Sequence, residues 1–248
     1  MNSARRILSE NDYKIFQTIT HEWQNSTDIE ECFLTWESKS KCKAQSKTSF
    51  LHTLCFNVRG LGMRWGEVLL LTLNGKFDVI TLLETGKFCK STITNAFSDY
   101  NMFYQKGENP HGGVLILIKQ YIRVSRIQSD VPNICVVDLH MDESIRLIGM
   151  YAPESKNWTW NDLFNVITNK CILIGDFNVD LEEDIDNGKN LLGWADKHSL
   201  AAYTLDCPTS LRSNREIDYA LVPGVQVTIR AYEGETTSDH KPIFCVIT

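Results

Sequence analysis

Short apolar runs, rich in β-branched and aliphatic residues, recur from Phe50 to the end of this 248-residue chain, and turn residues separate them. Such runs are typical of buried strands, and helix-like stretches lie between some of them. We predict helices at Trp65–Leu73, Trp160–Thr168 and Asn190–His198. We predict strands at Leu51–Val58, Val79–Leu83, Val114–Ile118, Ile134–Leu139, Ile145–Met150, Ile172–Ile174, Asp218–Val222 and Ile243–Ile247.

Strands that alternate with helices indicate an α/β fold, but three neighbouring runs have no helix between them. These runs are Val114–Ile118, Ile134–Leu139 and Ile145–Met150. Parallel strands need a long crossover connection, so we predict that these three strands pair antiparallel. The expected fold class is α/β, with two mixed, largely antiparallel sheets packed as a sandwich and flanked by helices.

Residues 1–49 differ from the rest of the chain. Apolar residues from Ile7 to Trp23 recur at roughly helical spacing, and Asp28–Trp36 can form a second short helix. The following segment, SKSKCKAQSKTS, is polar and basic, and we interpret it as a solvated linker, with a nucleic-acid patch as the alternative. We therefore predict an N-terminal helical extension and basic linker at 1–49, and one main domain at 50–248.

The charge balance excludes some classes of protein. Lys and Arg total 25 against 31 Asp and Glu, a net charge of −6, whereas a DNA-coating protein or a polybasic membrane binder relies on a positive field. The eight cysteines are scattered without a C-x-x-C pair, which argues against a zinc site and indicates reduced, intracellular thiols. We expect neither a signal peptide nor a membrane span, because the apolar runs fall short of ~18 residues.

Polar residues stand at the ends of the predicted strands, where an apolar core does not need them. A single case is explained by a strand that simply ends. Many cases in one chain indicate a site, because a carboxylate at the end of a buried strand costs desolvation unless it binds something. The residues concerned are Asn57, Glu84, Tyr151, Asp176, Asn178, Asp218, Asp239 and His240.

Some of these side chains suit a metal ion. Glu84, with Asn57 or Asp239, offers the hard oxygen ligands that Mg²⁺ accepts. Others suit acid–base chemistry. His240 can pair with Asp218, a carboxylate that would orient and charge the imidazole.

Asp176 and Asn178, two residues apart, face the same side of an extended segment and can hold one water between them. A metal ion, an oriented water and a histidine cation are the parts of a phosphodiester hydrolase. Neither a G-x-S-x-G nucleophile elbow nor a G-x-x-x-x-G-K-[ST] phosphate loop is present in the sequence.

Seven sequence blocks resemble, in order, the motifs of the endonuclease/exonuclease/phosphatase superfamily. The resemblance covers about residues 50–248, and GDFN with a downstream IDY and a terminal SDH is a specific combination. The blocks are CFNVRGL (55–61), DVITLLET (78–85), HGGVLILI (111–118), MYAPES (150–155), ILIGDFNVD (172–180), REIDYALVP (215–223) and SDHKPI (238–243).

Within the superfamily the chain looks like the apurinic-endonuclease-like domain of non-LTR (LINE-type) retrotransposons. N-x-R-G-L, HGGV, YAP and the short path of 42 residues from Asp176 to Asp218 carry this likeness. It implies a Mg²⁺-dependent endonuclease that nicks one strand of double-stranded DNA and leaves a 3′ hydroxyl to prime reverse transcription. It also implies a nuclear location and a reverse transcriptase in cis, and the end of the chain at Thr248 is expected of a domain within a longer polyprotein.

The resemblance also implies roles for matching residues. Glu84, Asn57 and Asp239 would hold Mg²⁺, with Mn²⁺ as a substitute. Asp176 and Asn178 would orient or activate the attacking water. His240, polarised by Asp218, would bind the scissile phosphate, as would Tyr151, and the weaker candidates for phosphate or DNA contacts are Thr209, Ser238, Arg59 and Arg212.

One position departs from the family pattern, because Leu83 stands where a polar Gln usually precedes the metal-binding Glu. A second-shell hydrogen bond would be missing there, which would alter metal affinity. Further basic residues expected near the strand-end face are candidates for phosphate contacts, with solvated surface charge as the alternative for each. They are Arg59, Arg64, Lys87, Lys156, Arg212 and Arg215.

Two other functions remain open. A cellular member of the superfamily would be an apurinic/apyrimidinic repair endonuclease or a phosphatase that acts on lipid or inositol phosphates. A catalytically silent nucleic-acid-binding module is the third reading, and it is disfavoured because every catalytic position holds the expected type of residue.

Overall fold

The computed structural model describes residues 14, 17, 21, 50–153 and 159–248. The chain divides into two units, Met1–Lys47 and Thr48–Thr248, and every strand and helix named below belongs to the second. The predictions for residues 1–49 fall almost entirely outside the described residues and stay predictions. Within the described part of the chain, no helix is long and apolar enough to cross a membrane.

The first sheet has six strands in the order β11-β12-β1-β2-β4-β3. Its one parallel pair, β1 and β2, lies at the centre, and the other neighbours are antiparallel. The strands are β1 (Leu51–Asn57), β2 (Val79–Leu83), β3 (Tyr100–Gln105), β4 (Val114–Lys119), β11 (Val227–Ala231) and β12 (Ile243–Ile247).

The second sheet repeats this plan with the order β5-β6-β7-β8-β10-β9. Its central pair, β7 and β8, is again the parallel one. The strands are β5 (Arg123–Ile127), β6 (Ile134–His140), β7 (Ser144–Tyr151), β8 (Cys171–Asp176), β9 (Ala201–Tyr203) and β10 (Asp218–Val222).

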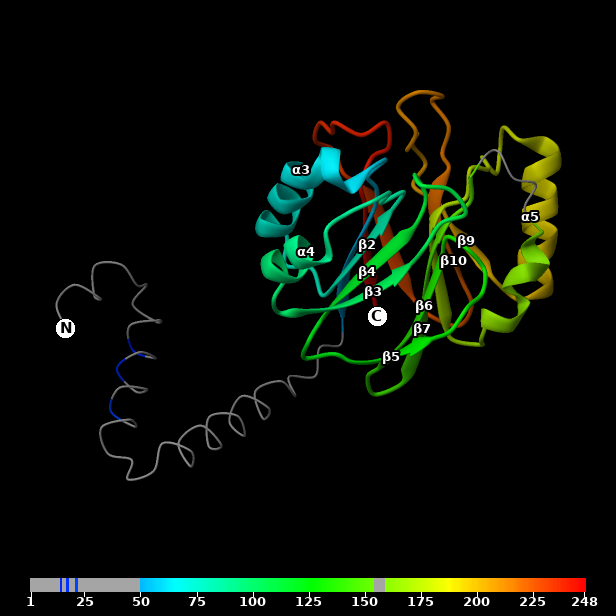
Figure 1. The fold of residues 1–248 in the computed structure, drawn as a ribbon. Coiled ribbons are helices and arrows are strands. Elements are labelled where there is room, and N and C mark those ends of the chain that lie inside the picture. The colour runs from blue at the N-terminus through cyan, green and yellow to red at the C-terminus, as the bar shows by residue number, and fades with distance from the viewer. Residues whose placement is uncertain (1–13, 15–16, 18–20, 22–49, 154–158) are drawn as a thin grey trace. The chain divides into compact units, whose positions relative to one another are not determined.

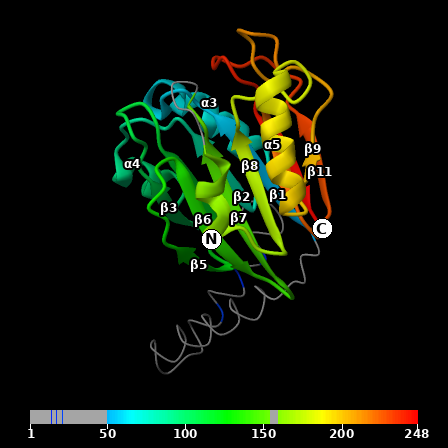
Figure 2. The same ribbon diagram turned by 90° about the vertical axis from the view of Figure 1, so that its right-hand side faces the viewer.

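The two sheets pack face to face, and helices cover both outer faces (Figures 1 and 2). In β1, Cys55 faces the second sheet, whereas Leu54 and Phe56 pack under the helices of the first. Burial on both faces explains why the strands read as continuous apolar runs rather than alternating ones. The helices are α3 (Leu61–Asn74) and α4 (Lys90–Ala96) on the first sheet, and η2 (Trp160–Val166) and α5 (Ile185–Lys197) on the second.

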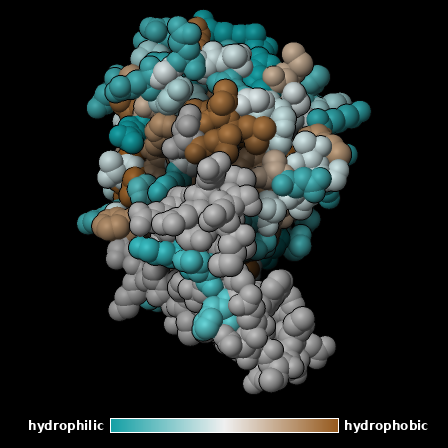
Figure 3. Space-filling model, turned by 90° about the vertical axis from the view of Figure 1, so that its left-hand side faces the viewer, coloured by the Kyte–Doolittle hydropathy of each residue, from teal (hydrophilic) through white to brown (hydrophobic). Residues whose placement is uncertain are grey.

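Helix α3 buries Leu61 and Val68 but leaves Met63, Leu70 and Leu73 exposed on its outer side. Apolar side chains gather on this face of the domain in the space-filling view (Figure 3). These three side chains lie outside the core, so they contribute little to the packing of the first sheet.

The predicted two-sheet mixed sandwich is confirmed, and all eight predicted strands are present. The four strands that we did not predict, β3, β5, β9 and β11, are the four edge strands of the two sheets. Edge strands are covered on fewer sides and carry more polar residues, so their sequences lack the apolar run that marks a central strand. Helix α4 was also not predicted, and the predicted helix at 160–168 is a 3₁₀-helix, η2.

The prediction that three consecutive strands pair antiparallel was wrong in part. Strands β6 and β7 do pair antiparallel, but β4 lies in the other sheet, between β2 and β3. The chain changes sheet after β4, and the unpredicted edge strand β5 is the first strand of the second sheet. Without β5 in the sequence interpretation, β4 and β6 look like neighbours.

Candidate active site

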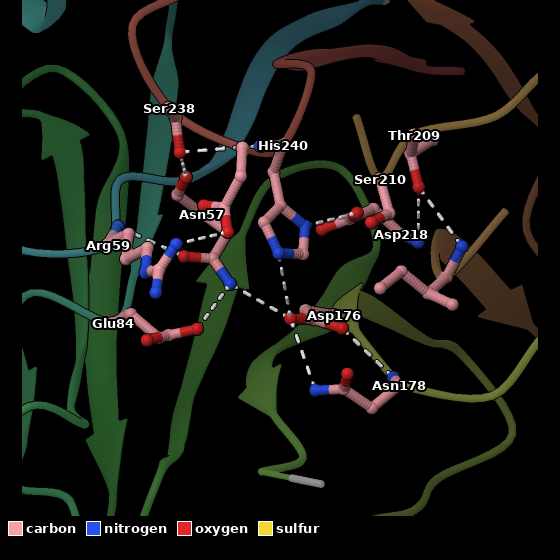
Figure 4. A network of polar contacts seen from close by, with 12 residues as sticks. Asn57, Arg59, Glu84, Asp176, Asn178, Thr209, Ser210, Asp218, Ser238 and His240 are labelled. Carbon is pink, nitrogen blue, oxygen red and sulfur yellow. Dashed lines mark hydrogen bonds and ion pairs between the residues drawn. The ribbon is translucent and has the colours of Figure 1, made fainter. Parts of the chain in front are cut away.

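The carboxyl ends of both central parallel pairs meet at one edge of the sandwich. In the first sheet Asn57 at the end of β1 pairs with Leu83 at the end of β2, and Glu84 follows. In the second sheet Tyr151 and Asp176 pair at the ends of β7 and β8. The fold therefore gathers the polar strand ends that the sequence places far apart (Figure 4).

Asn57 joins the two sheets at this edge. Its buried Nδ2 donates to Glu84 Oε1 at 2.9 Å and to Asp176 Oδ2, in the opposite sheet, at 2.8 Å. Its Oδ1 accepts the backbone N–H of Arg59 at 3.0 Å, which fixes the orientation of the amide. Asn57 thus holds two carboxylates at a set separation, as a donor to both.

His240 lies between two buried aspartates. Its Nδ1 is 2.8 Å from Asp218 Oδ2, and its Nε2 is 3.8 Å from Asp176 Oδ2. Burial lowers the pKa of His240, but Asp218 and then Asp176 and Asp239 raise it, with a net pKa of about 10. The imidazole is therefore a cation at neutral pH, with Nδ1–H donating to Asp218.

Asp176 is fully buried, and its environment is rich in negative charge. Burial and the neighbouring Asp218 raise the pKa of Asp176, against the lowering effect of His240. Its Oδ1 accepts the backbone N–H of Asn178 at 2.9 Å, while Asn178 Nδ2 donates to Ala152 O at 2.6 Å. Asn178 adopts φ +50°, so its side chain turns back toward the carboxylate it follows.

Glu84 and Tyr151 complete the cluster from the two sheets. Glu84 adopts φ +49° directly after β2, which turns its carboxylate toward Asn57. Burial, and then the charges of Glu84 and Asp176, raise the pKa of the Tyr151 phenol far above its usual range, so it stays a neutral hydrogen-bond donor. Leu83 is fully buried between the sheets and offers Glu84 no polar contact.

The cluster suits a hard divalent cation. One ligand atom each from Glu84, Asp176 and His240 lies within 4.8 Å of the others. The carboxylate oxygens of Glu84 and Asp176 are hard donors, which favour Mg²⁺ or Mn²⁺, whereas a protonated imidazole has no lone pair to offer a metal. Burial and then the charge of Asp218 raise the pKa of Asp176, and a bound cation would offset both effects. Asn57 presents its amide nitrogen to the carboxylates, so its role as a metal ligand stays a prediction.

Asp239 lies at the rim of the cluster with two arginines. Its Oδ2 accepts Arg59 Nη1 at 2.5 Å and Arg212 Nε at 2.9 Å. Its Oδ1 is shielded from solvent and has no hydrogen-bond partner among the described residues. The structure therefore places Asp239, Arg59 and Arg212 in one group, and their roles in metal and DNA binding stay predictions.

Two predicted phosphate contacts take part in positioning the cluster. Thr209 is fully buried, and its Oγ1 accepts the backbone N–H groups of Ile217 and Asp218, both at 3.0 Å. Ser238 Oγ donates to Asn57 O at 2.7 Å. Both hydroxyls hold the backbone of site residues, and contacts from them to a phosphate stay predictions.

Arg215 contacts the site in a way that the sequence analysis missed. The sequence makes it a candidate for DNA contacts, with solvated surface charge as the alternative, but its guanidinium donates to Asn178 O at 3.2 Å and pairs with Asp184. Asp184 Oδ2 in turn accepts the N–H of Asp180 at 2.8 Å, and Asp180 accepts the N–H of Glu216 at 2.8 Å. Arg64 likewise contacts the chain, donating to a backbone oxygen, and Lys156 lies outside the described residues. No sequence spacing signals the Arg215 contacts, because they join segments far apart in the chain.

Comparison with known proteins shows one matching family and several similar folds. A sequence model of the Endonuclease/Exonuclease/phosphatase family matches residues 54–240. No curated protein is found to match the chain.

Several solved structures share the fold. The endonuclease domain of TRAS1, a telomere-specific non-LTR retrotransposon, superimposes with a TM-score of 0.69 at 18% identity, over 80% of this chain and 98% of that one. The AP endonuclease LMAP from Leishmania major gives 0.62 at 14%, over 80% and 87%. The 3′ phosphatase NExo from Neisseria, bound to a product DNA hairpin, gives 0.60 at 14%, over 80% and 98%.

Proposed function

Because the chain belongs to the Endonuclease/Exonuclease/phosphatase family, we propose that it is a Mg²⁺-dependent DNA endonuclease that nicks one strand of a duplex and leaves a 3′ hydroxyl. The observation that carries this proposal is the row of buried groups Asp218, His240 and Asp176 beside Glu84. This row combines a histidine cation, which can bind a phosphate, with carboxylates, which can bind a metal ion and accept a proton from a water.

Each side chain has a part in the proposed hydrolysis. Asp176 accepts a proton from the attacking water, and Asn178 Oδ1 orients that water, since Nδ2 is engaged with a backbone oxygen. His240 Nε2–H donates to a non-bridging oxygen of the scissile phosphate and offsets the charge that develops there. The Tyr151 hydroxyl donates to the same phosphate.

A divalent cation held by Glu84 and Asp176, with Asn57 and Asp239 as further candidate ligands, would polarise the phosphate. Asn57 keeps Glu84 and Asp176 in place through its two hydrogen bonds. Asp218 keeps His240 protonated and oriented. The water oxygen forms the new bond to phosphorus, and the bond from phosphorus to the 3′ oxygen of the DNA strand breaks. The leaving 3′ oxygen takes a proton from solvent and becomes the 3′ hydroxyl.

The biological setting is a proposal of its own. The sequence motifs and the fold likeness to the TRAS1 endonuclease domain support target-primed reverse transcription of a non-LTR retrotransposon, in which the nick supplies the primer. In that setting residues 50–248 are the endonuclease domain and residues 1–49 are an extension with a linker. A reverse transcriptase would act in cis, and the protein would work in the nucleus.

A nicking assay on supercoiled plasmid with Mg²⁺ tests the proposed activity. We expect nicked circles from the wild type and a loss of about 10²-fold or more for Asp176→Asn and His240→Gln. Asp196→Asn, on the exposed side of α5, and His52→Gln, at the opposite end of β1, make the same chemical changes away from the site and should nick normally. A folded wild type that never nicks with any divalent metal would falsify the proposal, as would normal nicking by Asp176→Asn.

The fold likeness to AP endonucleases and to a 3′ phosphatase makes a cellular repair enzyme or a phosphatase the alternative. Paired oligonucleotides, one intact and one with an abasic site, separate the two nuclease readings, since retrotransposition requires cleavage of intact DNA. Strong preference for the abasic strand would favour repair. Phosphate release from a soluble inositol phosphate, without plasmid nicking, would favour the phosphatase.

A further inference from the structure

Two loops at the same edge of the sandwich form a shallow basic groove next to the candidate active site. Residues 84–89 follow β2 and begin with Glu84 itself, and residues 106–113 join β3 to β4. The groove has a volume of about 550 Å³, and we call it the lysine groove. Its main lining side chains are Lys87, Phe88, Lys90, Tyr104, Lys106 and Asn109.

The lysines of the groove are not neutralised by the protein. Within the described residues, no ion pair or hydrogen bond is found for the side chains of Lys87, Lys90 and Lys106, whereas Lys119 pairs with Asp99 and Lys170 with Glu143. One acid, Glu108, also lines the groove. In a chain with a net charge of −6, three unpaired cations beside an acidic site form a local positive field.

The two loops that line the groove are held by hydrogen bonds. The loops are tied together by Gly86 N–H to Gly112 O at 3.1 Å, and Asn109 Oδ1 accepts the N–H groups of His111 and Gly112 at 2.9 and 2.8 Å. Phe88 and Tyr104, which also line the groove, pack edge to face with ring centroids 5.0 Å apart. Loops held by these contacts, with three lysines among the lining residues, are organised for an extended anion before that anion binds.

We propose that the lysine groove binds the sugar–phosphate backbone of duplex DNA next to the scissile phosphate. The loop that carries Lys87 and Lys90 also carries Glu84, so DNA held in the groove runs into the site. Lysines are flexible point charges that contact phosphates without reading bases. The groove therefore contributes to the affinity for DNA and to its position rather than to sequence specificity. This inference rests on the proposed function only for its choice of substrate.

Salt dependence of binding provides the test. We would measure binding of a fluorescent 20-base-pair duplex by anisotropy in EDTA, where no cleavage occurs, over a range of salt concentrations. The triple variant Lys87→Gln, Lys90→Gln, Lys106→Gln should lose affinity. The slope of log Kobs against log salt should fall by about 0.9 for each lysine that contacts a phosphate.

The matched control removes three other lysines at the opposite ends of the strands, as Lys76→Gln, Lys119→Gln, Lys170→Gln. It has the same net charge, so it should keep the wild-type slope if the effect is local, and thermal melting would confirm that both variants fold. A groove variant with the slope of the wild type, or the same loss in both triple variants, would overturn the inference, as would a wild type without measurable DNA binding. Failure of the wild type to nick plasmid concerns the proposed activity alone, because the binding assay needs no catalysis.

Discussion

Asp176 and Asp218 stand directly opposite each other in the antiparallel pair of β8 and β10, and both side chains are buried. Two like charges at paired positions repel each other, and each loses the solvation it has in water. The His240 cation compensates both, since its ring nitrogens lie 2.8 Å from Asp218 and 3.8 Å from Asp176. The charge state of His240 is therefore a condition for the stability of this edge.

We expect the imidazole of His240 to stay protonated through pH 8 and to titrate near pH 10, because its pKa is raised from an ordinary value of 6.5 to about 10. Between pH 6.5 and about pH 10, the imidazole of His240 holds a proton in the folded state that it has released in the unfolded state. The contribution of His240 is full below about pH 6.5 and is lost as the pH rises toward 10, by about 1.4 kcal/mol per pH unit.

Imidazole NMR shifts, assigned with His240→Gln, would give the pKa directly, and urea unfolding between pH 6 and 10 would give the stability. Titration near 6.5 would contradict the prediction. At pH 7 the variant His240→Gln should lose about 3–5 kcal/mol of unfolding free energy, because it leaves two buried carboxylates without a cation. His52→Gln should lose much less.

Metal binding should depend on Glu84 and not on His240. Glu84→Gln removes a charged oxygen ligand, so Mn²⁺ affinity should fall about 10-fold or more. His240→Gln removes a positive charge from the cluster, so it should keep or raise Mn²⁺ affinity, provided that circular dichroism shows it folded. Electron paramagnetic resonance of free Mn²⁺ measures the Mn²⁺ affinity of both variants without DNA. Glu143→Gln, in the turn between β6 and β7, is the control, and loss of binding in His240→Gln would mean that the imidazole is a ligand.

Arg215 should affect turnover beyond its effect on stability. Arg215→Gln removes the contacts to Asn178 O and to Asp184, which hold the loop after β8, so the nicking rate should fall about 10-fold with little change in KM. The control is Arg146→Gln. Arg146 pairs with Asp138 at 2.7 and 3.0 Å, and its side chain is 16% exposed against 19% for Arg215.

Both arginine variants should lose similar thermal stability, because each breaks a half-buried ion pair. Only Arg215→Gln should lower kcat, since Arg146 lies away from the site in β7. Equal kcat for the two variants, measured well below their melting temperatures, would show that Arg215 does not position the loop after β8, which carries Asn178.

Gly175 should tolerate no side chain. A Cβ at this position would lie 1.9 Å from Met150 O in the neighbouring strand β7, so Gly175→Ala must displace backbone next to Asp176. We expect Gly175→Ala to lose more than about 3 kcal/mol of unfolding free energy, or to fail to fold. Gly193 lies in α5, and a Cβ added there would have open space around it. Gly193→Ala should therefore raise the free energy of unfolding by about 1 kcal/mol. Urea unfolding of the two variants compares them, and a stable Gly175→Ala protein would contradict the geometry.

The amino-acid pattern alone is enough to predict the central strands and to name the residues of the cluster. Central strands are buried on both faces, and only continuous apolar runs satisfy that condition. Strands β1, β2, β7 and β8 can therefore be predicted from the sequence. Glu84, Asp176 and Asp218 were recognisable because each is a carboxylate at the end of such a run. The edge strands β3, β5, β9 and β11 were not predicted, because partial burial puts few constraints on their composition.

Which polar groups face each other depends on the complete fold, because hydrogen bonds between distant segments leave no periodic pattern in the sequence. The sequence predicts Asn57 as a metal ligand, which stays a prediction, but it gives no sign that the amide donates to Glu84 and to Asp176 from the other sheet. Arg215 was expected to face solvent or DNA, yet it donates to Asn178 O. Hydrophobic burial fixes where strands lie along the chain, whereas the direction of each polar side chain depends on the partners that the completed fold brings within 3 Å or so.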